Sequence, residues 1–332
     1  MMEYEKIFIT GSTGVVGKPL LKKLASKGHK VYALDRSKTS NNKFEKIGVT
    51  SIKGDLFEDS LKDRLFNLGI DAIFHVAGVN QMCAKNPSHM FKTNIEGTKS
   101  MLDLGNHLKI KKFVYTSSAV TLGEKHGTIG SELSEHRGSF LSKYEESKYL
   151  AEKEAFQHRK DFEFVSINPS SVQGPGRVSG TAKLLISTLR KKYPPLIKNN
   201  ISIIDIDDCT EGHYKGLLKG KNNERYVLNS FYLQSYELIN ILKLITEWEG
   251  NPIYIPKAVL KTVAPLGDFI KVFSLNPPFI CSESIRVLTN GHLYDGSKAK
   301  KDLGVEYIKV EDFIKKTVNW LIEEKYIALK KI

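Results

Sequence analysis

The sequence predicts an α/β protein built on a doubly wound parallel sheet, with a smaller lobe towards the C-terminus. Three observations predict this fold class. Apolar strand-like runs alternate with helix-like runs through the first half of the chain, as in parallel sheets covered by helices on both faces. A glycine-rich segment joins the first strand-like run to the first helix-like run. Past Pro169 the alternation gives way to clusters of glycine and proline, such as Gly174-Pro175-Gly176 and Pro194-Pro195.

The N-terminal half supplies the expected strands and helices of the main sheet. The strands are short runs of apolar or β-branched residues, at 6–9, 30–34, 50–53, 72–76, 112–116 and 162–168. Apolar residues recur at helical spacing in the expected helices, at 17–27, 91–108 and 141–155. Gly28 is expected to end the first of these helices, because glycine readily adopts the left-handed conformation found beyond helix C-termini.

The C-terminal half is expected to be more irregular. Short strands are expected at 201–206, 225–228 and 252–255, with one helix beginning at Asp208 and another at 235–248. The segment 257–285 is apolar but is interrupted by proline, at Pro265, Pro277 and Pro278. We interpret this segment as a partly helical substrate lobe, and a helix that lies in a membrane interface is the alternative.

The composition restricts the class of protein. Hydrophobic residues make up 41% and charged residues 26% of the chain, as in ordinary soluble domains. No run of about 18 apolar residues is present, so no membrane span is expected. The formal net charge of +13 would suit a nucleic-acid partner, but the lysines are dispersed and do not alternate with aromatic residues. No nucleic-acid partner is therefore expected, although a mild preference for anionic substrates or surfaces stays open.

Cysteine usage and the N-terminus bear on the cellular compartment. Cys83, Cys209 and Cys281 are widely separated and lack metal-ligand spacing, so neither a disulfide framework nor a metal site is expected. This usage fits a reducing compartment. The first strand begins by Ile7, which leaves no room for a signal peptide. We therefore expect a cytoplasmic protein.

The loop from Thr10 to Gly17, with the sequence TGSTGVVG, predicts a phosphate-binding turn. It joins a strand to a helix, where glycines allow a tight turn and close approach of the backbone to a pyrophosphate. The helix N-terminus adds oriented N–H groups and positive dipole charge. Because an acid, Asp35, ends the second strand, the pattern indicates a dinucleotide site rather than a merely tight turn.

Asp35 and Arg36 bear on which dinucleotide is bound. A carboxylate at the end of the second strand accepts hydrogen bonds from the adenosine ribose and repels a 2′-phosphate, which favours NAD. The arginine that follows could instead neutralise the 2′-phosphate of NADP. NAD is therefore the favoured cofactor and NADP the alternative.

Tyr144 and Lys148 form a candidate acid–base pair. Four residues apart on a helix, they lie one turn apart on the same face. An ammonium beside a phenol lowers a phenol pKa that is normally about 10, which makes Tyr144 a usable proton donor and acceptor near neutral pH. Three further pairs share this spacing and are interpreted as surface or packing residues: Tyr149/Lys153, Tyr294/Lys298 and Tyr326/Lys330.

Eight segments occur along the chain in the order and spacing of one known family. They are the glycines Gly11, Gly14 and Gly17, then Gly54-Asp55-Leu56, His75–Gly78, Asn94–Thr98, Tyr115–Ser118, Tyr144/Lys148, Asn168–Ser171 and Asp295–Gly304. With these segments the chain resembles the extended short-chain dehydrogenases/reductases, whose fold is of the Rossmann type. The resemblance spans essentially the whole chain and implies an NAD(P)-dependent enzyme.

The resemblance also implies a site and a division into domains. Ser118, Tyr144 and Lys148 would be catalytic, with Ser117 competing for the role of Ser118 because neighbours on a strand point in opposite directions. Residues 1–170 would form the dinucleotide-binding domain, to which 201–230 would return, and 171–332 would form mostly the substrate lobe. The implied cofactor-binding residues are Gly11, Thr13, Gly14, Val15, Val16, Gly17, Asp35, Arg36, Asp55, Leu56, Val76, Ala77, Gly78, Ser117, Tyr144, Lys148, Pro169 and Ser171.

The chemistry that the resemblance implies is the interconversion of a carbonyl and an alcohol by hydride transfer. Tyr144 would give or take the hydroxyl proton, Lys148 would lower its pKa, and Ser118 would hydrogen-bond the substrate oxygen. The segments 168–176 and 203–213 resemble dihydroflavonol-reductase and 3β-hydroxysteroid-dehydrogenase relatives.

Two alternatives to this oxidoreductase stay open. One is a nucleotide-sugar epimerase, in which Arg177 and Arg225 would grip a diphosphate. The other is a protein that senses or binds the dinucleotide without turnover. Dehydration is disfavoured, because Ala119 and Val120 follow Ser118 where dehydratases of the family place an acidic pair.

The family often forms dimers through two helices, and this chain is expected to be a homodimer. The helices would be those at about 88–108 and 142–158, packed as a four-helix bundle. The apolar positions that motivate this expectation are Met90, Ile95, Met101, Leu102 and Leu104.

Overall fold

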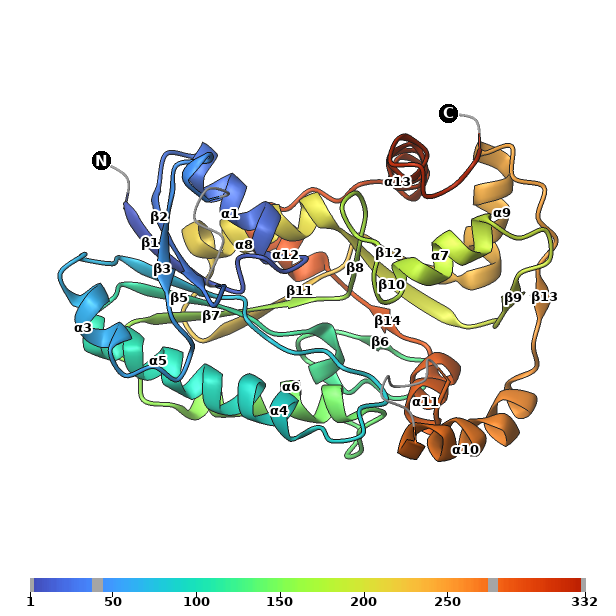
Figure 1. The fold of residues 1–332 in the computed structure, drawn as a ribbon, viewed down its shortest axis with the longest axis horizontal. Coiled ribbons are helices and arrows are strands. Elements are labelled where there is room, and N and C mark those ends of the chain that lie inside the picture. The colour runs from blue at the N-terminus through green and yellow to red at the C-terminus, as the bar shows by residue number, and fades with distance from the viewer. Residues whose placement is uncertain (1–2, 38–43, 274–279, 330–332) are drawn as a thin grey trace.

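A seven-stranded parallel sheet forms the centre of the molecule in the computed structural model, which describes residues 3–37, 44–273 and 280–329 (Figure 1). Its strands are β1 (Lys6–Thr10), β2 (Lys30–Asp35), β3 (Val49–Lys53), β4 (Ala72–His75), β5 (Lys112–Thr116), β7 (Glu163–Pro169) and β11 (Glu224–Leu228). The spatial order is β11-β7-β5-β4-β1-β2-β3, so the chain changes direction between β1 and β4. Such sheets bind ligands at the carboxyl ends of the strands beside this switch point.

Helices cover both faces of the sheet, which confirms the doubly wound fold (Figure 1). One face carries α1 (Gly17–Ser26), α8 (Ile206–Lys219) and α12 (Ser297–Leu303), and the other carries α3 (Leu61–Phe66), α4 (Ser88–Phe91), α5 (Gly97–Leu108) and α6 (Lys143–Gln157). Each face has its own apolar core. Leu20 and Leu24 of α1 lie in the first core, and Leu102 of α5 with Ala151 of α6 in the second.

The long helix expected at 91–108 is interrupted. A π-helical segment, η1 (Lys92–Glu96), separates α4 from α5. Such segments insert a residue into the helical ladder and are frequent at functional sites. Here the segment contains Asn94, whose buried side chain contacts both α6 and the loop after β4.

The C-terminal half builds a second, smaller assembly. A three-stranded sheet, β12-β10-β8, contains β8 (Ser171–Gln173), β10 (Asn200–Asp205) and β12 (Phe231–Gln234). The helices around it are α7 (Ala182–Leu189), α9 (Ser235–Ile245) and α13 (Val310–Glu323), which share a core that includes Leu242 and Phe313. Two short parallel pairs complete it, β9 (Pro195–Leu196) with β13 (Ile253–Tyr254) and β6 (Ile129–Gly130) with β14 (Leu293–Tyr294).

The segment 201–230 is divided between the two sheets. β10 belongs to the small sheet, whereas α8 packs on α1 and β11 joins the edge of the large sheet. The chain therefore crosses between the two sheets more than once after Pro169. The expected domain boundaries stay a prediction.

The apolar segment 257–285 is largely helical where the structure describes it. It contains α10 (Lys257–Phe273) and the start of α11 (Ser282–Asn290). Pro265 lies inside α10, whereas Pro277 and Pro278 fall outside the described residues. No helix in the described ranges is both long and apolar enough to span a membrane.

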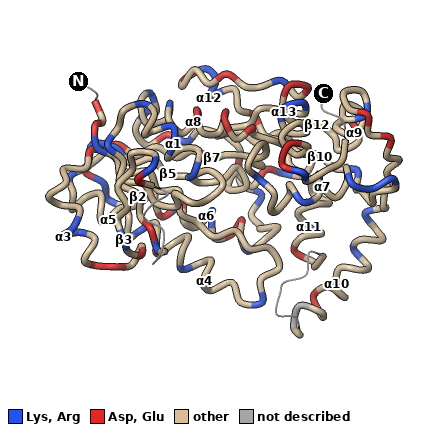
Figure 2. Tube along the Cα trace, turned by 45° about the horizontal axis from the view of Figure 1, so that its top comes forward, with Lys and Arg blue, Asp and Glu red and all other residues tan. Residues whose placement is uncertain are grey.

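Lysines and arginines are interspersed with acidic residues along the chain (Figure 2). The apolar residues that motivated the homodimer lie mostly inside the chain's own core: Met90, Met101, Leu102 and Leu104 are buried, and Ile95 is partly buried. They therefore offer little apolar surface to a second copy, and the homodimer stays a prediction.

The expectation that the chain has no disulfide was wrong. Cys83 and Cys281 are bonded to each other, with their Cα atoms 6.1 Å apart. They lie 198 residues apart in sequence, so only the tertiary fold brings them together and their spacing could not reveal the pair. Cys209 is free and buried. Cysteine usage consequently no longer argues for a reducing compartment, and the cytoplasmic location stays a prediction.

Candidate active site

The loop after β1 forms a cradle that only glycine can build. Gly11 has a φ of +69°, and a Cβ there would lie 2.6 Å from the backbone nitrogen of Ala77. A Cβ on Gly17 would overlap the carbonyl oxygen of Gly11, and Gly14 closes the turn by donating its N–H to that oxygen at 3.0 Å. Thr13 and Val15 are exposed on the loop.

The N-terminus of α1 suits an anion. No side chain caps it, and its first turn contains no acid. The first N–H groups of a helix lack partners within the helix and carry positive dipole charge. The cradle and the helix N-terminus together fit the pyrophosphate of a dinucleotide. Val16, at the helix start, is partly buried against the core beneath the loop.

The end of β2 differs electrostatically from what the sequence suggested. Asp35 is only 4% exposed, and its Oδ2 accepts a hydrogen bond from Lys53 Nζ at 2.7 Å. Its Oδ1 accepts from the Ser37 N–H at 2.9 Å, while the Arg36 side chain is exposed. Lys53 therefore offsets the negative charge that was expected to repel a 2′-phosphate. Sequence reasoning missed Lys53, although it is the last residue of β3 and lies directly opposite Asp35 in the sheet.

The ends of β3 and β4 complete the edge of the sheet. Asp55 accepts a hydrogen bond from the Phe57 N–H at 3.2 Å, and Leu56 is buried beside it. Val76, Ala77 and Gly78 follow β4. Among them, Ala77 donates its N–H to Thr10 Oγ1 at 3.2 Å, which ties this loop to the end of β1.

Ser118, Tyr144 and Lys148 meet at the carboxyl end of β5. α6 begins at its N-cap residue Ser142, which accepts the Glu145 N–H at 3.0 Å, and this start places Tyr144 in the first turn. Tyr144 is half-buried, and the Ser118 side chain is close enough to lower its pKa. Ser117 points elsewhere: its hydroxyl is buried and has no hydrogen-bond partner among the described residues.

Lys148 is anchored on β5. Its Nζ donates to the hydroxyl of Tyr115 at 2.8 Å and to the carbonyl of Thr116 at 2.9 Å. Burial lowers the pKa of Lys148 to about 7, and the charge of Glu152 opposes this shift. The Lys148 side chain can therefore gain or lose a proton near neutral pH.

The pKa of Tyr144 differs from the sequence-based expectation. Burial raises it above the usual value of 10, and the opposing influences are the hydrogen bond from Ser118 and the positive charge of Arg177. The ammonium of Lys148 donates to Tyr115 and Thr116. Tyr144 is thus held as the neutral phenol, the form that donates a proton.

A buried polar network supports these residues and was missed in the sequence. Glu152, one turn beyond Lys148, accepts from Ser166 Oγ at 2.8 Å and from Asn168 Nδ2 at 2.7 Å. Asn168 also donates to the Ser118 carbonyl at 3.3 Å, so the network joins α6, β7 and the end of β5. The sequence does contain a signal for Glu152, because Tyr144, Lys148 and Glu152 are spaced four residues apart along one helical face.

The segment that follows β8 brings Arg177 close to Tyr144. Pro169 ends β7, and Ser171 accepts a hydrogen bond from Gln173 Nε2 at 2.8 Å. Arg177 donates to the Val172 carbonyl and is close enough to Tyr144 to lower its pKa. Arg225 is engaged elsewhere, 3.7 Å from Glu152 and over the ring of Phe156.

Comparison with known proteins identifies the family of this chain. The model of the NAD dependent epimerase/dehydratase family matches residues 7–228, two thirds of the chain. The chain belongs to this family. A putative dihydroflavonol 4-reductase of Synechocystis sp. is 26% identical, covering 96% of this chain and 95% of that protein. Sterol demethylase protein B of Methylococcus capsulatus is 22% identical, with coverage of 96% and 99%. The crystal structure of gox2253 shares the fold, with a TM-score of 0.82, 24% identity and coverage of 98% and 100%.

Within this family member, two of the other Tyr-x-x-x-Lys pairs have packing roles. Tyr149 packs against the rings of His136 and Phe140. Tyr294 is buried and stacked on His292, and its partner Lys298 donates to Glu224 and to the carbonyl of Arg225. Lys330, of the last pair, lies outside the described residues.

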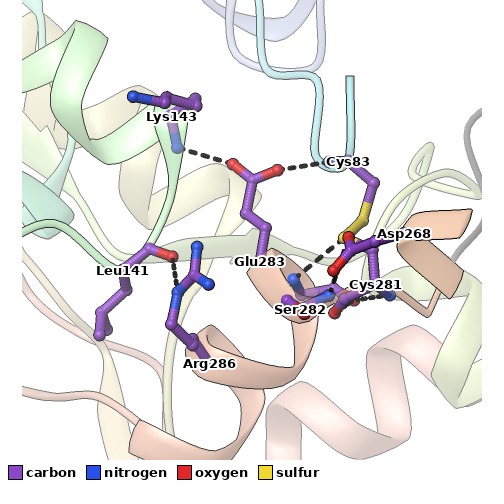
Figure 3. The surroundings of a disulfide bond; sticks show 9 residues. Cys83, Leu141, Lys143, Asp268, Cys281, Ser282, Glu283 and Arg286 are labelled. Atoms are coloured by element: carbon purple, nitrogen blue, oxygen red, sulfur yellow. Dashed lines mark hydrogen bonds between the residues drawn. A yellow bond between two sulfur atoms is a disulfide. The ribbon is translucent and has the colours of Figure 1, made fainter. Parts of the chain in front are cut away.

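The disulfide lies beside contacts that connect α11 and the loop after β4 to the start of α6 (Figure 3). Cys281 is the N-cap residue of α11, and Cys83 lies in the loop after β4. Glu283 of α11 accepts the N–H of Cys83 and the N–H of Lys143, both at 2.6 Å. Lys143 is the residue before Tyr144, so α11, the β4 loop and the start of α6 are held together. The two sulfurs also lie near Glu283 at metal-ligand spacing, but their bond to each other removes both as ligands.

Proposed function

We propose that this family member is an NAD(P)-dependent oxidoreductase that interconverts a carbonyl group and an alcohol of a small-molecule substrate. The observation that carries the proposal is the meeting of Ser118, Tyr144 and Lys148 at the end of β5, on the edge of the sheet that also holds the glycine cradle. A bound nicotinamide dinucleotide would supply or accept the hydride.

Each of the three side chains has a distinct part in this chemistry. Tyr144, kept as the neutral phenol by burial, donates its proton to the carbonyl oxygen during reduction. The Ser118 hydroxyl donates to the same oxygen as charge develops on it. Lys148 supplies positive charge beneath Tyr144 and is positioned by Tyr115 and Thr116. In the reverse direction the phenolate would take up the alcohol proton.

The substrate class is a ketone, an aldehyde or a secondary alcohol. Similarity to a dihydroflavonol 4-reductase over nearly the whole chain supports a reductase. Of the two arginines considered for gripping a diphosphate, Arg225 is bound to Glu152 and Phe156. That leaves Arg177 alone near Tyr144, which favours the reductase over a nucleotide-sugar epimerase.

A two-stage experiment tests the proposal. Calorimetry first measures the binding of NAD and NADP. Turnover is then followed at the nicotinamide absorbance band, with the reduced or oxidised dinucleotide and panels of carbonyl compounds, alcohols and sugar nucleotides. We expect turnover with a carbonyl–alcohol pair. Epimerisation of a sugar nucleotide, or tight binding with no turnover on any panel, would replace the oxidoreductase with the epimerase or the sensor.

The proposal includes a homodimer, which light scattering would detect as twice the chain mass of 37.4 kDa.

Lys53 is expected to decide how well NADP competes with NAD. NAD is the favoured cofactor because a carboxylate at the end of β2, here Asp35, would accept hydrogen bonds from the adenosine ribose. The ion pair with Lys53 offsets the repulsion that Asp35 would exert on a 2′-phosphate. Lys53→Met should therefore weaken NADP at least about tenfold relative to NAD, measured as the ratio of the two dissociation constants. Lys30→Met is the matched control, since Lys30 pairs with Glu5 at the other end of the sheet. An unchanged ratio in Lys53→Met would remove Lys53 from cofactor selection.

Glu152 is expected to set the alkaline limit of activity. Its charge raises the pKa of Lys148 against the effect of burial, so Glu152→Gln should lower that pKa below about 7. Lys148 would then lose its proton at lower pH, and the alkaline limb of the kcat/KM profile should move to lower pH by about one unit. Glu154→Gln is the control, because Glu154 lies in the same helix but is only partly buried and pairs with Lys99. A profile that does not move in Glu152→Gln would contradict this role.

The lowered pKa of Lys148 also determines whether the stability of the fold rises or falls with pH. The pKa of Lys148 falls to about 7 on folding, below its ordinary value of about 10.4. Between these values the unfolded chain binds a proton that the folded chain does not. The contribution of this group to the free energy of unfolding therefore rises with pH across that window.

A further inference from the structure

Glu283 of α11 binds two segments that are distant from it in the sequence. Its Oε2 accepts the N–H of Cys83 and its Oε1 accepts the N–H of Lys143, both at 2.6 Å (Figure 3). Cys83 lies in the loop after β4, whereas Lys143 is the first residue of α6. Because both oxygens are used, one carboxylate connects that loop directly to the start of the helix that carries Tyr144.

The Lys143 N–H is one that α6 cannot satisfy by itself. The first N–H groups of an α-helix have no partner inside the helix and carry positive partial charge, so they bind a carboxylate from outside well. The N-cap side chain of Ser142 accepts the N–H of Glu145 at 3.0 Å, and Glu283 accepts the N–H of the residue directly before Tyr144. The position of the first helical turn, and of the phenol on it, is therefore set partly by α11.

The disulfide holds Glu283 at this contact. Cys281 is the N-cap residue of α11, and Glu283 follows two residues later in the first turn. The bond between Cys281 and Cys83 therefore fixes the end of α11 that carries the carboxylate. The backbone of Cys83 has a φ of +57°, a left-handed conformation that persists in residues other than glycine only when surrounding contacts impose it. The disulfide and the hydrogen bond to Glu283 are two such contacts, so breaking the bond should let the loop relax away from the carboxylate.

We propose that Glu283 is a positioning residue for Tyr144 and that the Cys83–Cys281 bond keeps it in place, so that catalysis depends on the redox state of this pair. With the bond intact, the carboxylate holds the first turn of α6. When the pair is reduced, α11 is free to move away and the phenol loses its fixed position. The inference rests on the proposed function, because proton transfer requires the phenol of Tyr144 to lie within hydrogen-bond reach of the substrate oxygen.

Other contacts of α6 should keep the site folded when the bond is broken. Asn94 Oδ1 accepts the N–H of Val79 at 2.8 Å, and its Nδ2 donates to Ser147 Oγ at 2.9 Å, which joins the loop after β4 to α6 beyond Tyr144. Lys148 remains bound to β5 through the hydroxyl of Tyr115. Since none of these contacts involves α11, we expect reduction to lower kcat rather than to dismantle the site.

Reduction of the pair is a thiol–disulfide exchange with a dithiol, for which dithiothreitol is the probe. A thiolate of the reagent attacks one sulfur to form a mixed disulfide, and its second thiol then displaces the protein sulfur. Two electrons and two protons pass to Cys83 and Cys281, which end as thiols, and the reagent ends as a cyclic disulfide. Both cysteines are buried, so the reagent reaches them through local opening, and the incubation continues until a count of free thiols is constant.

Kinetics on a carbonyl substrate test the positioning role in the whole chain. Oxidised Glu283→Gln should have a kcat lowered at least about tenfold, because its amide offers one acceptor oxygen in place of two, while the dissociation constant of the dinucleotide changes less than about twofold. Glu311→Gln is the matched control, since Glu311 is also the second residue of its helix, α13, but is exposed. A kcat of Glu283→Gln equal to that of Glu311→Gln would overturn the proposal.

Reduction tests the role of the bond. Dithiothreitol should lower the kcat of the wild type at least about threefold, and reoxidation with oxidised glutathione should restore it. Cys281→Ser should resemble the reduced wild type and ignore the reductant, and α11 should still begin there because serine is a favoured N-cap residue. Since the bond acts through Glu283, reduction should cause no further loss in Glu283→Gln. No loss in the wild type, or an equal loss in both proteins, would contradict this coupling.

Amide hydrogen exchange separates this inference from the proposed chemistry. Peptides that cover residues 141–147 should exchange faster in Glu283→Gln and in the reduced wild type, because the Lys143 N–H loses its acceptor. Faster exchange without turnover on any substrate panel would support the positioning contact and reject the proposed function. Unchanged exchange would overturn the inference even where turnover is found. If circular dichroism shows Cys281→Ser to be unfolded at the assay temperature, the reversible reduction of the wild type decides the outcome.

Discussion

Replacing Tyr144 by phenylalanine should reduce turnover about 10²- to 10⁴-fold while dinucleotide binding changes little. The substitution removes only the phenol hydroxyl, which is held neutral by burial. Because the ring stays, the packing at the start of α6 and the placement of Lys148 on β5 should persist. Initial rates on a substrate from the carbonyl panel, together with calorimetry of the dinucleotide, measure both halves of this prediction.

Tyr149→Phe supplies the control for this experiment. Tyr149 shares the helix and the spacing to a following lysine, but it packs against His136 and Phe140. Its hydroxyl should be dispensable, with rates within a factor of about three of the wild type. Turnover by Tyr144→Phe at the level of Tyr149→Phe would remove Tyr144 from the chemistry.

Breaking the disulfide should have the largest effect on stability. The bond closes a loop of nearly 200 residues, between the loop after β4 and the N-cap of α11. In the chain-entropy model, Cys281→Ser should lower the free energy of unfolding by about 2–5 kcal/mol. The loss would fall on the part of the fold where Glu283 also binds the N–H groups of Cys83 and Lys143.

Denaturant unfolding with and without a reductant measures this effect. Reductant should destabilise the wild type to about the level of Cys281→Ser and should leave the variant unchanged. Cys209→Ala, which alters the free buried cysteine, should still respond to reductant like the wild type. A wild-type unfolding midpoint that does not respond to reductant would contradict a stabilising role for the bond.

Local patterns were sufficient to predict the main sheet and the glycine turn after β1. The strands of the sheet are apolar runs bounded by turn residues, and the turn at Gly11, Gly14 and Gly17 reflects steric limits that act within a few residues. The register of Tyr144 and Lys148 likewise follows from helical geometry alone. These features do not depend on which distant segments come together.

Contacts between distant segments could not be predicted from the same patterns. The Cys83–Cys281 bond and the Asp35–Lys53 ion pair depend on tertiary structure, and each changed an expectation drawn from the sequence. The pKa of Tyr144 is a third case, because burial raises it, and the spacing of Tyr144 and Lys148 along the helix does not reveal that burial. The positions of the electrostatic partners, rather than the residue types, were the missing information.

Isotope transfer tests the central claim most directly. The protein is incubated with a carbonyl substrate and a reduced dinucleotide that carries deuterium at the transferring position of the nicotinamide, and the product is examined by mass spectrometry. Hydride transfer predicts an alcohol with one deuterium on the former carbonyl carbon, formed by the wild type and nearly absent with Tyr144→Phe. An alcohol that contains no deuterium, or equal yields from both proteins, would contradict it.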